Sequence, residues 1–148
     1  MQNLSKSIKI TRVSASAAAG TSDVTGSVLD MQGFDGVLFI ASFGTLTATQ
    51  VTSLKAQQGS QSDGSDMADL EGSKVGPLAD GDGGKCLVLD LFRPGKRYVR
   101  AVVDRGTANA VVDDVIAVQY CGTKAPTTHD AATIAAAELH VSPAEGTA

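Results

Sequence analysis

Residues 81–86 combine glycines with an aspartate and a lysine, a composition that could bind phosphate. Gly81-Asp82-Gly83-Gly84-Lys85-Cys86 has the outline of a loop that holds phosphate. Such a loop needs a glycine five residues before its Gly-Lys pair and a serine or threonine after it, but this chain has Ala79 and Cys86 there. A strand-like run follows, so no helix N-terminus could receive the phosphate. The sequence therefore argues against a nucleotide site.

The long loop 59–84 carries carboxylates that could in principle bind calcium, which prefers hard oxygen ligands. They are Asp63, Asp66, Asp69, Glu71, Asp80 and Asp82. Their spacing lacks the alternating ligands, sixth-position glycine and twelfth-position glutamate of an EF-hand. The pattern favours a solvated acidic loop, and binding of an ion or a glycan by residues 59–84 stays open.

The two histidines, His129 and His140, lie 11 residues apart in a C-terminal tail, with no cysteine or acidic partner at metal-ligand spacing. His129 and Asp130 could be combined with a serine into a nucleophile set, but a flexible tail cannot preorganise one. The chain also has no Gly-x-Ser-x-Gly elbow. We expect no enzyme, no metal site and no cofactor.

Four cations form the remaining candidate site: Arg93, Lys96, Arg97 and Arg100. They could simply keep strand ends soluble. Alternatively, they could contact an acidic protein partner or a neighbouring subunit, because the guanidinium fork suits carboxylates. Nucleic acid is not expected as the partner, since a net charge of −4 lacks the basic excess that phosphate contacts need.

The elements that would position these cations lie in Lys85–Arg105. Apolar residues alternate on both sides of Arg93-Pro94-Gly95-Lys96, and Pro-Gly is a strong turn signal. Period-two spacing predicts strands. Residues sharing a face are Leu87, Leu89 and Leu91 before the turn, and Val99, Ala101 and Val103 after it. We therefore predict a β-hairpin with the cations at and beside its turn.

The rest of the chain adds further short strands and no convincing long helix, which predicts an all-β fold: a jelly-roll-like antiparallel β-sandwich over residues 1–121. Gly36–Phe43 is expected to be a central strand covered on both faces. The other strands are predicted at Ser7–Val13, Ser27–Met31, Val51–Gln57 and Asp114–Cys121, with a connector over residues 14–26.

The tail, residues 122–148, loses the strand pattern and is expected to be extended and to dock on a neighbouring subunit. Ala131–Glu138 could form two helical turns with Asp130 as the cap.

Length and composition indicate one domain with a thin core, because alanine and valine dominate and tryptophan is absent. Cys86 and Cys121 are expected to be buried free thiols, with a mutual disulfide as the alternative. The sequence shows no secretory signal and no run of roughly 20 apolar residues, so we expect intracellular synthesis and no membrane partner.

Several local motifs also resemble a known family when taken in chain order. They are the Gly33–Gly36 turn, a strand ending in Ala41-Ser42-Phe43-Gly44, the acidic stretch Gln61–Leu70, the segments Lys96–Arg100 and Ile116–Tyr120, and a tail beginning Lys-x-Pro-Thr-Thr-His. Over nearly its whole length the chain resembles a family of small tailed-bacteriophage virion proteins that includes head decoration, or cement, proteins.

The resemblance implies a jelly-roll protein, made in the host cytoplasm, that forms a homodimer or homotrimer on the outer surface of the capsid. There it would bind the major capsid protein and stabilise the lattice, and Arg93, Lys96, Arg97 and Arg100 are the expected contact residues. The alternative within the virion is a tail or fibre-associated β-sandwich binding module. A hydrolytic jelly-roll enzyme would need clustered histidines and glutamates, and no predicted strand carries a histidine.

Overall fold

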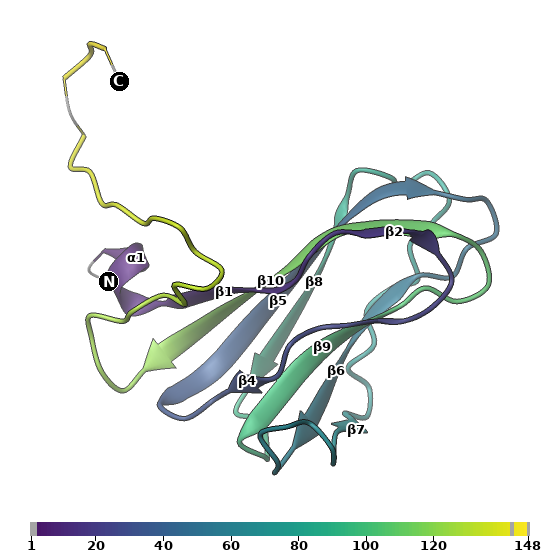
Figure 1. The fold of residues 1–148 in the computed structure, drawn as a ribbon, viewed down its shortest axis with the longest axis horizontal. Helices are drawn as coiled ribbons and strands as arrows, with labels where there is room; N and C mark the ends of the chain where they lie inside the picture. The colour runs from purple at the N-terminus through teal and green to yellow at the C-terminus, as the bar shows by residue number, and fades with distance from the viewer. Residues whose placement is uncertain (1–2, 143, 148) are drawn as a thin grey trace.

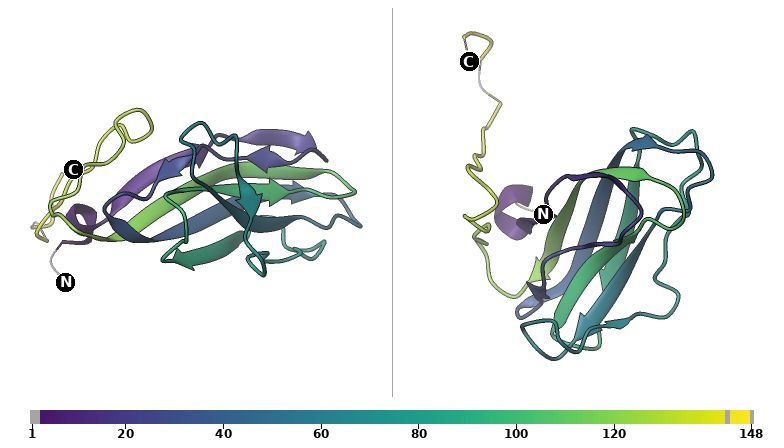
Figure 2. Two further views of the ribbon diagram at one scale, coloured as in Figure 1. Left: turned by 90° about the horizontal axis from the view of Figure 1, so that it is seen from below. Right: turned by 45° about the vertical axis from the view of Figure 1, so that its right-hand side comes forward.

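Two antiparallel β-sheets form the body of the protein in the computed structural model, which describes residues 3–142 and 144–147 (Figures 1 and 2). A short helix, α1 (Leu4–Ser7), precedes the strands. Sheet A contains β1 (Lys9–Ser14), β2 (Ala17–Gly20), β5 (Phe34–Leu46), β8 (Cys86–Phe92) and β10 (Ala110–Gly122). Sheet B contains β3 (Val24–Thr25), β4 (Leu29–Asp30), β6 (Ser53–Gly59), β7 (Ala68–Asp69) and β9 (Tyr98–Asp104).

The strand order confirms the predicted antiparallel β-sandwich. Sheet A runs β1-β10-β5-β8, with β2 also paired to β10, and sheet B runs β3-β9-β6-β7, with β4 also paired to β9. If β1 with β2, and β3 with β4, are each counted as one interrupted strand, the total is eight, the number in a jelly roll. The finer jelly-roll assignment stays a prediction.

The core lies between the two sheets and consists mainly of valine and alanine. Its largest fully buried apolar side chains are Phe39, Phe43 and Leu54. The prediction that residues 36–43 are covered on both faces is wrong: Val37 is buried, but the outward-facing Ile40 is only half-buried. A two-layer sandwich covers one face of each sheet and leaves the other to solvent.

The predicted hairpin over Lys85–Arg105 is also wrong, although both of its strands exist. β8 pairs with β5 and β9 pairs with β6, so the 93–97 turn carries the chain from sheet A to sheet B. The predicted faces are correct, because Leu89 and Val99 point inward and are buried. Pro-Gly marks a turn but does not determine whether the flanking strands pair with each other.

Segments expected to be irregular contribute smaller elements. The connector over residues 14–26 contains β2 and β3, and the loop 59–84 contains β7 and a β-bridge from Val75 to Leu54. Residues 131–138 do not form two helical turns. A single turn is closed by Ile134 N–H donating to Asp130 O (2.8 Å), while Asp130 Oδ1 accepts from Ala132 N–H (3.0 Å).

The tail after β10 first returns to the edge of β1 and passes beside α1, and its yellow end then leads away from the sandwich (Figure 1). Of the helices in the described part of the chain, none has the length and hydropathy to cross a bilayer.

Candidate functional site

The four predicted contact residues lie along the turn between β8 and β9 and the start of β9. Arg93 has a φ of 52°, which turns the chain out of β8, and its guanidinium carbon lies 5.1 Å from the centre of the Phe92 ring. The Lys96 backbone N–H donates to Gln58 Oε1 (3.2 Å) on β6. The side chains of both Arg93 and Lys96 are exposed, and the structure gives neither an ion pair with another described residue.

Arg97 forms an ion pair and hydrogen bonds within its own subunit. Its Nε donates to Asp30 Oδ1 (2.8 Å) and its Nη2 donates to Asp30 Oδ2 (2.6 Å) and to Gln32 Oε1 (2.5 Å). The hydrogen bond from Arg97 holds the pKa of Asp30 below its ordinary value of 3.8, against the opposing effect of burial. This bidentate pair fastens the β4 edge strand to the start of β9.

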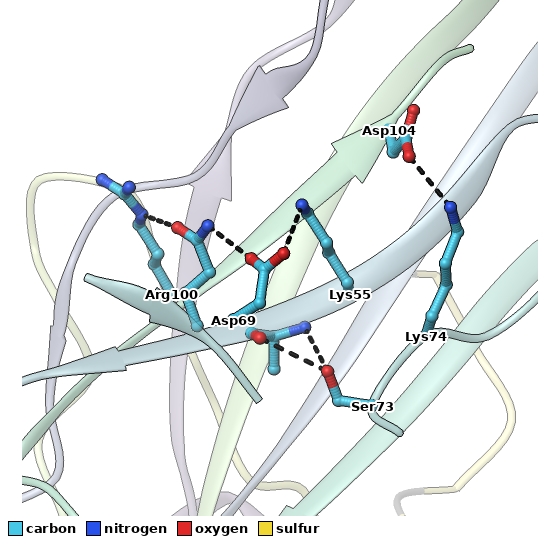
Figure 3. Close-up of polar contacts among 8 residues, drawn as sticks. Lys55, Asp69, Ser73, Lys74, Arg100 and Asp104 are labelled. Atoms are coloured by element: carbon cyan, nitrogen blue, oxygen red, sulfur yellow. Dashed lines mark hydrogen bonds and ion pairs between the residues drawn. The ribbon is translucent and has the colours of Figure 1, made fainter. Parts of the chain in front are cut away.

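Arg100 belongs to a polar chain across the outer face of sheet B (Figure 3). Its Nε donates to Gln57 Oε1 (2.7 Å), Gln57 Nε2 donates to Asp69 Oδ1 (2.6 Å), and Lys55 Nζ contacts Asp69 Oδ2 at 2.8 Å. The hydrogen bond from Lys55, followed by that from Gln57, lowers the pKa of Asp69. The chain joins β9, β6 and β7, so Arg100 and Asp69 help to hold the short β7 in place.

A neighbouring ion pair, Lys74 Nζ to Asp104 Oδ2 at 2.9 Å, anchors the middle of the loop 59–84 to β9 (Figure 3). The hydrogen bond from Lys74 lowers the pKa of Asp104.

The predicted cluster therefore divides in two. Arg97 and Arg100 hold sheet B together, whereas Arg93 and Lys96 face solvent beside a cleft of about 440 Å³. The cleft is lined by Met31, Gln32, Phe34, Asp35, Arg93, Pro94, Lys96 and Arg97. Its lining combines the apolar side chains of Met31, Phe34 and Pro94 with three cations and the carboxylate of Asp35. An exposed guanidinium there could bind a carboxylate of a protein partner with two hydrogen bonds.

Three of the six carboxylates in the acidic loop, those of Asp63, Asp66 and Asp82, accept hydrogen bonds from the loop's own backbone. Asp66 accepts from Ser60 N–H (2.8 Å) and Gln61 N–H (3.0 Å), and the first of these contributes most to lowering its pKa. Asp82 accepts from Lys85 Nζ (2.5 Å) and from Ala79 N–H (2.9 Å). Histidines, cysteines and carboxylates of the described residues form no group of three that could hold a metal ion.

The two histidines are separated in the structure. His129 Nδ1 accepts a hydrogen bond from Ile10 N–H (3.1 Å) at the edge of β1, whereas His140 Nε2 lies 3.1 Å from Glu138 Oε2 in the projecting part of the tail.

Both cysteines are free and exposed, so the prediction of buried thiols is wrong. Cys86 occupies an outward position of β8 together with Val88, and Cys121 lies at the end of β10 with a φ of 52°. Cys86 alternates with the leucines of β8, and in a two-layer sandwich the face opposite the core points to solvent.

Sequence reasoning missed Arg105, which is a buried cation with a structural role. It is only 7% exposed and donates to Ser22 O (2.6 Å), Ala18 O (2.6 Å) and Ala110 O (3.0 Å). Its guanidinium lies against Gly20, where an added Cβ would come 2.9 Å from Nη2. The sequence places Arg105 at the end of a strand, beside Gly106. That position does not distinguish a buried arginine from an exposed one.

Comparison of the chain with models of known protein families finds no match, and a search of curated protein sequences also returns none.

Proposed function

We propose that this chain is a structural virion protein that binds the outer surface of a tailed-phage head and stabilises the capsid lattice. The observation that supports it is the surface at the 93–97 turn. There two exposed cations, Arg93 and Lys96, border a cleft of about 440 Å³ at one end of a small β-sandwich. The resemblance of the sequence to decoration proteins supplies the identity of the partner, an acidic surface of the major capsid protein.

The mechanism is linkage between binding and assembly. A protein that binds the assembled lattice but not the separate capsid subunits stabilises the lattice, by about 2.7 kcal/mol per site at a free concentration 100 times its Kd. Many symmetric copies add these contributions over the shell, so a modest contact at each site is sufficient.

Mass spectrometry of purified particles, calibrated against the major capsid protein, tests the role. Hundreds of copies in a simple ratio to the capsid subunit are expected. A handful of copies would instead indicate a tail or fibre-associated module, and absence from particles would refute a virion role.

Charge reversal tests the surface. The double variant Arg93→Glu with Lys96→Glu should lose binding to empty capsids by at least about 10-fold, because it places two carboxylates against an acidic partner. The charge-matched control is Lys6→Glu with Lys85→Glu, which changes two exposed lysines away from the cleft; the exposed ion pair between Lys85 and Asp82 contributes little to stability. Equal capsid occupancy of the two double variants would show that Arg93 and Lys96 only keep the turn soluble.

A further inference from the structure

The two edges of sheet A differ in whether another segment of the chain covers them. Along β1 the tail supplies side chains to the free backbone groups: Thr127 Oγ1 donates to Ile8 O, His129 Nδ1 accepts from Ile10 N–H (3.1 Å) and Thr133 Oγ1 accepts from Arg12 N–H (3.2 Å). The opposite edge is β8, which pairs with β5 alone among the described strands (Figure 1).

The register of β8 identifies which of its backbone groups are open. Arg93 N–H donates to Asp35 O (2.7 Å) and Phe43 N–H donates to Lys85 O (3.1 Å), so odd-numbered residues form the hydrogen-bonded pairs with β5. In an antiparallel ladder the intervening residues direct N–H and C=O away from the partner strand. The open groups therefore belong to Cys86, Val88, Asp90 and Phe92.

This edge has none of the features that normally prevent strand pairing. β8 is seven residues long and pairs with β5 without a register shift. It contains no proline and no lysine, and its single charge, Asp90, accepts a hydrogen bond from Tyr120 Oη (2.6 Å). Val88 is 50% exposed and Phe92 is 55% exposed. An unpaired edge without a bulge, a proline or a lysine is a template for another strand.

We infer that β8 pairs antiparallel with β8 of a second copy of this chain, around a two-fold axis beside Leu89. In that register Cys86 lies opposite Phe92 of the second copy, and Val88 lies opposite Asp90. All four open residues of each strand then form hydrogen-bonded pairs.

The proposed register pairs more open residues than its neighbours do. A slide by two residues in one direction sets Asp90 opposite Asp90 of the second copy, which places like charges against each other. A slide by two residues in the other direction sets Val88 opposite Val88 and leaves Phe92 without a partner in β8. In the proposed register the cations Lys85 and Arg93 lie opposite each other only at the two ends of the ladder, where Lys85 is already paired with Asp82 at 2.5 Å.

We assign a second copy of the chain to this edge because β8 can pair with itself, so that one strand supplies both halves of a two-fold interface. The two sheets A would become one continuous sheet.

Disulfide trapping tests the register. Phe92→Cys, in a Cys121→Ser background, creates a thiol opposite Cys86 of the second copy at a Cα separation of about 5.5 Å. This lies within the range that a disulfide spans, roughly 4.4–6.8 Å. Oxidation of the full chain with diamide should convert most of the protein to a covalent dimer. Val51→Cys in the same background is the control, since Val51 is 44% exposed and lies outside β8. Cross-linking no greater than in this control would overturn the register.

Sedimentation velocity tests whether the chain dimerises through the β8 edge, without introducing a disulfide. The parent chain should be a dimer, and Val88→Glu should weaken dimerisation by at least about 10-fold, because it places a carboxylate opposite Asp90 of the second copy. Val51→Glu should leave the dimer intact. A monomeric parent chain, or a dimer unaffected by Val88→Glu, would overturn the inference. Both experiments are done without capsids, so failure here is separate from failure of the proposed function.

Discussion

The first half of the tail should stabilise the domain, whereas the second half should not. Thr127, His129 and Thr133 contact β1 or the residue before it in the same subunit, whereas residues 135–142 form no hydrogen bond with the strands in the described part of the chain, and the end of the tail projects away (Figure 1). Two truncations separate these parts: one ends the chain after Ile134 and the other ends it after Gly122. We expect the first to unfold like the full chain and the second to be less stable.

The size of the loss follows from the contacts at the β1 edge. Thr127, His129 and Thr133 each make one side-chain hydrogen bond to the backbone of residues 8–12, and Thr127 N–H donates to Lys6 O (2.9 Å). A hydrogen bond contributes about 0.5–1.5 kcal/mol, and partial exposure favours the lower end of that range. The truncation after Gly122 also removes the bond from Thr123 N–H to Gly33 O (2.9 Å). Five such bonds give about 2.5 kcal/mol. For a chain of this size, that corresponds to a fall in Tm of about 5–10 °C.

The assay is thermal and urea unfolding of the three chains at a concentration where each is in the same oligomeric state. Thr133→Val is the finer probe, because it removes one acceptor from Arg12 N–H while nearly keeping the side-chain volume. Thr128→Val is its matched control on an exposed neighbouring position. Equal stability of both truncations and the full chain would refute the covering role of residues 127–134.

Three further predictions concern single side chains. Arg105→Met should cost about 2–4 kcal/mol in urea unfolding, because three carbonyl oxygens lose a charged donor, and a loss below about 1 kcal/mol would contradict the role given to Arg105. Arg97 lowers the pKa of Asp30, so their ion pair stabilises the fold above pH 3.8 and this contribution is lost as the pH falls through the lowered value. Asp30→Asn should therefore show a shallower acid limb in the pH dependence of Tm, and an unchanged limb would argue against it. Burial, followed by the hydrogen bond to Asp90, raises the pKa of Tyr120 from 10.0 to about 12. The unfolded chain ionises first, so stability should fall between pH 10 and pH 12, and Tyr120→Phe should remove that loss; an identical alkaline profile would refute it.

The local sequence pattern predicted where strands form and which face of each is buried. It did not predict which strands pair with each other. The alternation at Leu89 and Val99 identified the buried face of both strands, because burial on one side of a strand imposes a period of two on the sequence. The same alternation could not assign β8 and β9 to different sheets. Inward-facing residues have the same period whether two strands lie side by side or face each other across a core.

The candidate site shows the same division. Four cations lie within eight residues of the sequence, but the sequence does not show that Arg97 forms an ion pair with Asp30, which is distant along the chain. That contact depends on β4 pairing with β9, which brings together residues 67 apart in the sequence. Only Arg93 and Lys96 are left for a partner, and their role stays a prediction.

The sequence by itself determined the class of the fold and the faces of its main strands, because these depend on neighbours two residues apart. The tertiary structure alone decided the strand order, the burial of Arg105, the exposure of Cys86 and the difference between the two edges of sheet A. The physical reason is that each of these depends on which distant segments meet. The tail covers β1 because its threonines and histidine reach the free groups of that strand, and no segment of the described chain does the same for β8.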